Sequence, residues 1–392
     1  MRVRGLDVLM VGWLESTKYE VQGTKLKQLA FFCRLSLVAG LGGESMQIGK
    51  HEIKISGIDR AILSDTQKRL DMLTKPLGSL GRLEELAKTV VAITEKKNPV
   101  LKDKVIVTMA GDHGIAREGV SAYPMEVTPQ MVLNFLNGGA GINVLAKHVG
   151  AKVIVVDMGV NYDFKGAPGL VDKKIAKGTG SFTVGRAMTR DEAIRSVEAG
   201  IDIVLAEKEL DMVGTGDMGI GNTSPSAAIT SIYTGKPVAE VTGRGTGIDD
   251  KGLKNKIELI EKGIALNKPD KSDALDVLSK VGGFEIGGLA GVILGGAMRK
   301  VPVVIDGFIS TAAALIAVNI EPGAREYLIA SHNSVENGHR HALEYLQLKP
   351  ILNLELRLGE GTGAALAMNI IEASVKILNE MATFERAGVS NK

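Results

Sequence analysis

The chain has 392 residues, enough for two or three domains with a substantial hydrophobic core. Apolar residues make up 45%, charged residues 23% and the formal net charge is +2, so neither a nucleic-acid-binding surface nor a membrane protein is expected. The one cysteine, Cys33, excludes a disulfide within the chain and a cysteine-rich zinc site.

The first 45 residues differ in pattern from the rest of the chain. They contain the only tryptophan, Trp13, and an apolar run over Leu29–Leu41 that Arg34 interrupts. This run starts too far from the N-terminus for a signal peptide, and it is too short for a membrane-spanning helix. We expect residues 1–45 to be a weakly ordered extension, with Met46 as a plausible true start.

Helices are predicted next, in a segment that we place at 46–100. Residues 58–95 have helical periodicity, which Pro76, Gly78 and Gly81 interrupt within "TKPLGSLGRLEELA". The segment therefore predicts two helices. We expect it to form a smaller helical domain together with the C-terminal segment 341–392.

Short apolar strands alternate with helices over 101–340, which we expect to be the large domain. Continuous Val and Ile runs are typical of parallel strands that are buried on both faces. The predicted strands are Val105–Ala110, Val153–Val160 and Val301–Phe308, with weaker candidates in "DMVGTGDMG" and "YLIASH". One predicted helix begins at Thr128, its expected N-cap. The other predicted helices cover 189–206, 223–232, 251–266, 285–299 and 363–379. This order predicts an α/β fold with a Rossmann-like parallel sheet flanked by helices, and ligands beyond the carboxyl ends of the strands.

Glycine is the compositional outlier, because 48 of the 392 residues are glycine, well above the usual share of about 7%. In "GTGDMGIGNTSPSAA", Gly214, Gly216, Gly219 and Gly221 precede a predicted helix. Free backbone N–H groups at a helix N-terminus bind phosphate, so the segment predicts a phosphate or nucleotide site, with a tight turn lacking a ligand as the alternative. The G-x-G-x-x-G pattern within it also fits a dinucleotide-dependent oxidoreductase, for which Glu240 is the only loose candidate for the ribose-binding acid.

A second glycine-rich loop, "TGRGTGIDD", is followed by a predicted helix with three lysines. Lys251, Lys254 and Lys256 lie on its first turns, where a lysine could reach a phosphate. A solvated basic face is the alternative for each of them.

Histidines and acids elsewhere do not form a metal-binding pattern. His113 follows a strand in "AGDHGI", and the three histidines of "SHNSVENGHRH" lack the spacing of a zinc site, so we expect a structural or substrate-contact loop and no metal. Asp306 ends a strand as a single acid, unlike the paired acids of enzymes that bind phosphoribosyl pyrophosphate through magnesium.

Glu360 is an acid with no bulky neighbours, in "LRLGEGTGAALAM". Gly359, Gly361 and Gly363 surround it, just before a predicted helix. We expect the dipole of that helix to favour the carboxylate and hold its pKa at an ordinary or lowered value. We also expect the glycines to let a flat ligand approach. Glu360 is therefore a candidate catalytic or substrate-binding residue, with a plain helix-terminal charge as the alternative.

Eight motifs together resemble one family, the nicotinate-nucleotide–dimethylbenzimidazole phosphoribosyltransferases. They occur in order from about Asp59 to Ala373, and eight ordered motifs are more specific than any single one. They are "LTKPLGSLGRLEELA", "AGDHGIAREGVSAYPMEVTPQMVLNFLNGGAGINVLA", "VVDMGV", "GDMGIGNTS", "GRGTGIDD", "GGLAGVILGGAMRKVPVVIDGFISTAAALIA", "SHNSVENGH" and "LRLGEGTGAALA".

The resemblance implies transfer of 5-phosphoribosyl from nicotinate mononucleotide to 5,6-dimethylbenzimidazole or a related base, in assembly of the cobalamin nucleotide loop. It implies Glu360 as proton acceptor, no cofactor, no metal, and a cytoplasmic homodimer. The nucleotide- and phosphate-binding residues that it implies are Asp217, Gly219, Gly221, Asn222, Lys256 and Ser334. Its base-binding residues are Tyr123, Met131 and Met218.

One departure from the family concerns Asp217, where the family commonly has a glutamate. Aspartate is one methylene shorter, which changes its reach toward the ribose and phosphate. The bulky pocket of Tyr123, Met131 and Met218 leaves open a purine or phenol as the accepting base. Besides the oxidoreductase, the other alternative is a non-catalytic nucleotide-binding subunit.

Overall fold

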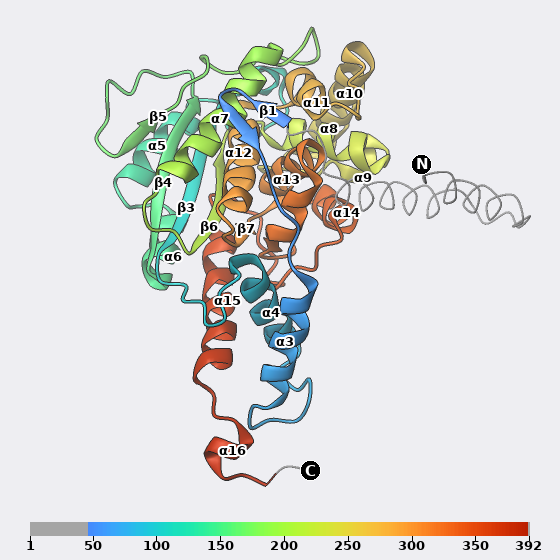
Figure 1. Ribbon diagram of the computed structural model, residues 1–392. Coiled ribbons are helices and arrows are strands. Elements are labelled where there is room, and N and C mark those ends of the chain that lie inside the picture. The colour runs from blue at the N-terminus through green and yellow to red at the C-terminus, as the bar shows by residue number, and fades with distance from the viewer. Residues whose placement is uncertain (1–45, 391–392) are drawn as a thin grey trace, which may run out of the picture. The chain divides into compact units, whose positions relative to one another are not determined.

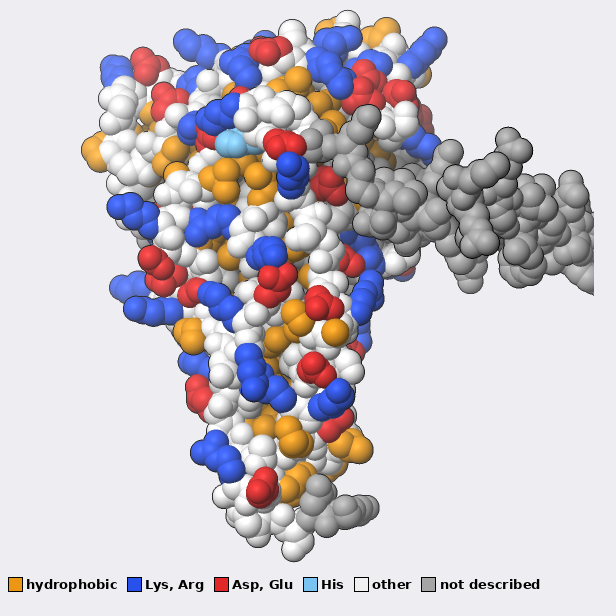
Figure 2. All heavy atoms as spheres, viewed as in Figure 1, with side chains coloured by type: hydrophobic (Ala, Val, Ile, Leu, Met, Phe, Trp, Pro, Cys, Tyr) orange, Lys and Arg blue, Asp and Glu red, His pale blue; other side chains and the backbone are white. Residues whose placement is uncertain are grey.

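A computed structural model describes residues 46–390, and the expectations for 1–45 lie outside this range (Figure 1). No helix in the described part of the chain is long and apolar enough to cross a membrane. Basic and acidic side chains are intermixed over the face shown in Figure 2, as the small net charge leads one to expect.

Within residues 46–390, a six-stranded parallel sheet has the order β5-β4-β3-β6-β7-β8. From β3 the chain adds β4 and β5 on one side, then crosses back to add β6, β7 and β8 on the other. The boundary between β3 and β6 is therefore the topological switch point, where such sheets leave a crevice for ligands. The strands are β3 (Lys104–Gly111), β4 (Ala151–Gly159), β5 (Leu170–Asp172), β6 (Met212–Met218), β7 (Val303–Ile305) and β8 (Leu328–Ala330).

Alternate residues of each strand supply two separate cores. On β3, Val105, Val107 and Met109 contribute to one core, and Ile106 and Ala110 to the other. This alternation follows from the two-residue period of a strand, and it explains the unbroken apolar runs. The fold class expected from the sequence is confirmed.

The larger core lies between the sheet and a helical layer in which α12 packs on α7 (Figure 1). Helix α12 is apolar on all sides because it lies between the sheet and α7. The helices of this core are α7 (Arg190–Ala206), α8 (Thr223–Thr234), α9 (Val238–Val241), α10 (Asp250–Asn267), α11 (Ala274–Val281), α12 (Phe284–Met298), α13 (Phe308–Ile320) and α14 (Asn337–Leu346). A hairpin of β1 (Met46–Ile48) and β2 (His51–Ile53) and the short helix η2 (Pro322–Tyr327) join it.

The opposite face of the sheet is covered by α5 (Val127–Leu136), α6 (Gly141–Val149) and the first half of α15 (Thr362–Glu380). The second half of α15 packs with α3 (Arg60–Asp71) and α4 (Arg82–Thr94) around a small core that includes Leu378 (Figure 1). The remaining short helices are η1 (Gly114–Glu118) and α16 (Phe384–Ala387). The expected domain boundaries stay a prediction.

Two local predictions were wrong. Thr128 is not an N-cap, because α5 begins at Val127, and the Thr128 hydroxyl instead accepts a hydrogen bond from the Ile220 backbone N–H (3.1 Å). The strand predicted over Val301–Phe308 covers only Val303–Ile305, and the last predicted residue, Phe308, already begins α13. An apolar run of this kind does not distinguish a buried strand from the start of a buried helix.

Candidate functional site

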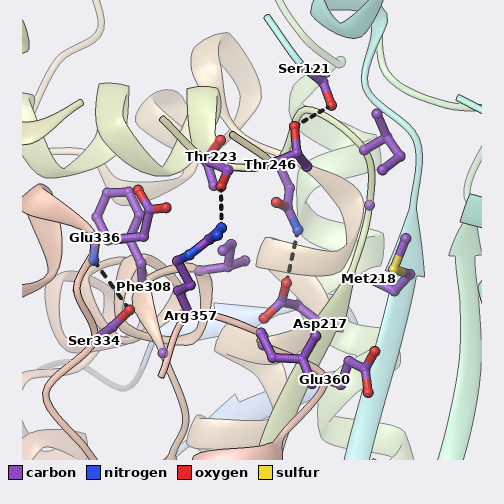
Figure 3. Close-up of a pocket in the computed structure, with 18 of the residues that line it drawn as sticks. Ser121, Asp217, Met218, Thr223, Thr246, Phe308, Ser334, Glu336, Arg357 and Glu360 are labelled. Atoms are coloured by element: carbon purple, nitrogen blue, oxygen red, sulfur yellow. Dashed lines mark hydrogen bonds between the residues drawn. The ribbon is translucent and has the colours of Figure 1, made fainter. Parts of the chain in front are cut away.

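A cavity of about 660 Å³ lies beyond the carboxyl ends of β6, β7 and β8, near the switch point of the sheet (Figure 3). Its lining includes nine of the ten residues that the sequence pointed to. These are Tyr123, Met131, Asp217, Met218, Gly219, Gly221, Asn222, Ser334 and Glu360. The tenth, Lys256, is fully buried behind the lining.

The loop between β6 and α8 forms one wall of the cavity, and its glycines are explained by close packing. A Cβ on Gly219 would lie 2.3 Å from the Gly111 carbonyl oxygen, and Gly221 has a φ of +90°. The glycine-rich loop predicted over Gly214–Gly221 is shorter than expected, and its binding of phosphate stays a prediction. Gly214 and Gly216 lie within β6, where they make room for α15 and for the backbone of Glu360.

Glu360 lies in a strained turn that leads into α15. Gly359, Glu360 and Gly361 have φ angles of +78°, +64° and +99°, a left-handed conformation that is unfavourable for a glutamate. The turn is held against the sheet, because the Thr108 hydroxyl donates a hydrogen bond to the Glu360 carbonyl oxygen (2.9 Å). A Cβ on Gly216 would lie 2.2 Å from that same oxygen.

The carboxyl group of Glu360 is buried and faces the N-terminus of α6. Its Oε2 accepts a hydrogen bond from the Ile142 backbone N–H (3.2 Å). Burial raises the pKa of Glu360, and the bond from Ile142 only partly opposes this. The expected ordinary or lowered pKa was wrong: the helix that Glu360 begins does not hold its carboxylate, and desolvation outweighs the single N–H of α6.

Asp306 occupies the N-terminus of α15 in its place. Its carboxylate accepts hydrogen bonds from the backbone N–H groups of Gly361, Gly363 and Ala364, at 3.0, 2.7 and 3.1 Å. Burial nevertheless raises the pKa of Asp306 to about 7. From the sequence, Asp306 stood out only as an acid without a second acid beside it. Its position at the end of a strand was the available signal, but its partners are 55 to 58 residues away.

The glycines around Glu360 serve this packing as well. A Cβ on Gly363 would lie 2.0 Å from His332 Nδ1, and one on Gly361 would lie 2.6 Å from the Ile106 side chain. Only Gly359 of the three lines the cavity. The expectation that all three glycines admit a flat ligand was wrong for Gly361 and Gly363, whose missing side chains make room for the protein itself.

Asp217 lies at the centre of the cavity wall (Figure 3). Its Oδ2 accepts a hydrogen bond from the Asn222 amide (2.9 Å), and its Oδ1 is buried without a hydrogen-bond partner among the described residues. Burial, and then the nearby Asp306, raise the pKa of Asp217 well above its usual value. The raised pKa favours the protonated form of Asp217, which donates a hydrogen bond.

Lys256 lies behind the cavity lining and contacts one of the lining residues, Thr223. Its Nζ donates hydrogen bonds to the Thr223 hydroxyl (2.6 Å), which belongs to the lining, and to the Gly243 carbonyl oxygen (3.2 Å). Burial lowers the pKa of Lys256 to about 8, while the charge of Glu336 acts to raise it. Ser334 also lines the cavity, and its N–H donates a hydrogen bond to His339 Nδ1 (2.9 Å).

Figure 3 shows the labelled residues divided between two ends of the cavity. Ser334 and Glu336 lie at one end, Met218 and Glu360 at the other, and Asp217 between them. Tyr123 is 57% exposed at the cavity mouth. The lining residues that sequence reasoning did not assign include Ser121, Thr246, Phe308, His332, Glu336 and Arg357.

A separate buried pair lies outside the cavity. His113 Nε2 is 2.7 Å from Glu285 Oε1, and both side chains are almost fully buried. Within residues 46–390, no group of three or more His, Cys, Asp or Glu side chains is arranged to hold a metal ion. The His113 ring packs behind Gly219, where an added Cβ would lie 3.3 Å from Nε2.

Comparison with known proteins adds an independent line of support. A family model described as "Phosphoribosyltransferase" matches residues 55–389. A Geobacter sp. (strain M21) protein named nicotinate-nucleotide–dimethylbenzimidazole phosphoribosyltransferase is 59% identical over 340 residues, 86% of this chain and 97% of that one. A Chloroflexus aggregans protein of the same name is 56% identical over 340 residues, 86% of this chain and 96% of that one. A crystal structure of the protein of this name from Thermus thermophilus matches with a TM-score of 0.81 and 43% identity, covering 86% of this chain and all of that one.

Proposed function

Because the chain belongs to the nicotinate-nucleotide–dimethylbenzimidazole phosphoribosyltransferase family, we propose how its own residues carry out that reaction. The enzyme transfers 5-phosphoribosyl from nicotinate mononucleotide to 5,6-dimethylbenzimidazole, giving α-ribazole 5′-phosphate and nicotinate for cobalamin assembly. The observation that carries the proposal is the position of Glu360: a buried carboxylate in a strained turn, at one end of the cavity.

The leaving group needs no acid catalyst. Nicotinate departs from a pyridinium nitrogen, so the electron pair of the broken C1′–N bond neutralises the positive charge on that ring nitrogen. The ribosyl C1′ becomes oxocarbenium-like, and the lone pair of a benzimidazole nitrogen forms the new bond from the opposite face, which inverts β to α. The other ring N–H then becomes acidic and gives its proton to Glu360.

The raised pKa of Glu360 suits this role. A carboxylate whose charge is poorly solvated is a stronger base than one in water, so it accepts the late proton more readily once it is ionised. Its Oε2 is held by the Ile142 N–H and its backbone by Thr108, which fixes the direction of proton transfer.

We assign the donor nucleotide to the opposite end of the cavity. Lys256, through the Thr223 hydroxyl, and Ser334 supply donors for the 5′-phosphate, together with the loop Gly219–Asn222 at the N-terminus of α8. Asp217 lies between the two ends, where its Oδ1, which has no hydrogen-bond partner among the described residues, is assigned to the nucleotide. Tyr123, Met131 and Met218 surround the accepting base.

One assay tests these assignments. The purified chain is incubated with nicotinate mononucleotide and a panel of benzimidazoles, purines and phenols, and the products are identified by mass. Nucleotide formation with 5,6-dimethylbenzimidazole is expected. Products only with a purine or a phenol would change the assigned base, and nicotinate mononucleotide binding without any transfer would favour the non-catalytic subunit.

We propose that the enzyme is a cytoplasmic homodimer. Exposed apolar side chains of Tyr123, Val335, Leu354 and Leu358 support a partner surface; Tyr123 and Leu358 line the cavity itself. A molar mass twice that of the chain, by light scattering after gel filtration, is expected.

A further inference from the structure

Glu336 has an unusual position for the residue that begins a helix. It is the N-cap of α14, but its side chain does not cap that helix. Its side chain instead lines the cavity, where neither carboxylate oxygen accepts a hydrogen bond from the described residues, and Oε2 is buried against Gly243. An acid at an N-cap ordinarily accepts N–H bonds of its own helix, and an unpaired buried oxygen is costly. Glu336 therefore has an acceptor available for a ligand.

The structure makes room for this carboxylate. A Cβ on Gly243 would lie 2.0 Å from Glu336 Oε2, so any side chain there would displace the carboxylate from this position. The same Gly243 accepts a hydrogen bond from Lys256 through its carbonyl oxygen, and the charge of Glu336 counteracts the loss of charge on Lys256. The Glu336 N–H donates to the Ser334 hydroxyl (3.4 Å). Glu336 thus interacts with both residues assigned to the phosphate end: with Ser334 by a hydrogen bond and with Lys256 through its charge.

The chemistry of the donor restricts what Glu336 can bind. A carboxylate only accepts hydrogen bonds. The 5′-phosphate and the carboxylate of nicotinate are anions, which Glu336 repels. The hydrogen-bond donors that remain on nicotinate mononucleotide are its 2′- and 3′-hydroxyls. These hydroxyls lie between the phosphate and C1′, so they are the groups of the donor that a carboxylate near the phosphate end can hold.

We propose that Glu336 binds the ribose hydroxyls of the donor and makes the enzyme selective for ribosyl over deoxyribosyl donors. This inference rests on the proposed function. Asp217, the other acid of the cavity with an unpaired buried oxygen, already accepts a hydrogen bond from the Asn222 amide (2.9 Å), whereas the Glu336 carboxylate accepts none from the described residues. The hydrogen bond that the 2′-hydroxyl donates to the carboxylate also strengthens as C1′ becomes cationic, so Glu336 contributes to kcat as well as to binding.

The test compares nicotinate mononucleotide with its 2′-deoxy and 3′-deoxy analogues, in the wild type and in Glu336→Ala and Glu336→Gln. Deoxy donors differ in intrinsic reactivity, but this difference cancels when the ratio of kcat/KM for ribo and deoxy donors is compared between proteins. We expect Glu336→Ala to lower that ratio about 10- to 100-fold and Glu336→Gln to lower it less, because the amide oxygen still accepts.

Glu344→Ala is the matched control, because Glu344 lies on the same helix with a 63% exposed side chain. It should leave the ratio unchanged. An equal loss of activity toward all donors in Glu336→Ala would reduce Glu336 to a structural role and overturn the proposal. If the wild type shows no transfer, the proposed function fails, and calorimetry with the same three nucleotides still decides the inference: equal affinities would refute it.

Discussion

The carboxylate of Glu360 accepts a hydrogen bond from the backbone N–H of Ile142, 218 residues earlier in the chain. The two residues meet because the N-terminus of α6 and the turn before α15 lie on the same face of the sheet. One helix thus positions the carboxylate, while Asp306 occupies the N-terminus of the other. This separation leaves Glu360 with a raised pKa and a free face toward the cavity.

Glu360→Gln should keep the fold and the binding of both substrates but lose transfer. General-base catalysis contributes on the order of 10²–10⁴ in rate, and a glutamine cannot take the proton. The measurement is nicotinate release from nicotinate mononucleotide plus 5,6-dimethylbenzimidazole. Glu380→Gln, an exposed site at the far end of α15, is the control. Retention of most nicotinate release would refute the role of Glu360.

The pH profile of kcat/KM should be bell-shaped. Glu360 acts as a carboxylate, so activity should fall as the pH drops through its raised pKa, at a higher pH than for an ordinary glutamate. Lys256 must be charged to bind phosphate, so donor binding should weaken as the pH rises through about 8. Lys256→Arg should remove the alkaline limb, because arginine stays charged.

Lys254→Arg is the control for that measurement, since Lys254 lies on the same helix with an 82% exposed side chain. An alkaline limb that persists unchanged in Lys256→Arg would show that another group titrates.

Gly216→Ala should disturb Glu360 without touching a ligand. The added Cβ would lie 2.2 Å from the Glu360 carbonyl oxygen, and because the atoms that it meets are backbone, the turn must shift. We expect a destabilisation of about 1–3 kcal/mol and at least a tenfold loss of kcat. Gly185→Ala is the matched control, because its Cβ would have no atom within 4 Å. Thermal unfolding and initial rates measure the two effects, and wild-type rates in Gly216→Ala would contradict this role of Gly216.

Asp306→Ala should destabilise the protein by about 3 kcal/mol, because three buried N–H groups of α15 lose their acceptor. Urea unfolding measures this change. Asp306 also holds the N–H of Gly361, the residue that follows Glu360. Activity per folded molecule should therefore fall as well, because Glu360 loses its position. A variant that is as stable as the wild type would show that Asp306 is not the cap.

The sequence pattern was sufficient for most of the sheet. Strands β3 and β4 were predicted almost to the residue, since a continuous Val and Ile run between two helices is seldom anything but a buried strand. Helix α13 was missed, because its sequence is apolar on every side and resembles an extension of β7. Strand β5 has only three residues and little pattern of its own.

By itself, the sequence determined the alternation of strands and helices, because this depends on residue types at short spacing. Its ordered motifs also identified the family, and through that resemblance the candidates that line the cavity. The roles of those candidates were decided only by tertiary structure. Which N–H holds Glu360, which acid caps α15 and why Gly216 and Gly363 lack side chains all depend on atoms brought together from distant parts of the chain. The raised pKa of Glu360 has the same origin, since burial by the assembled fold outweighs the local helix end that the sequence displays.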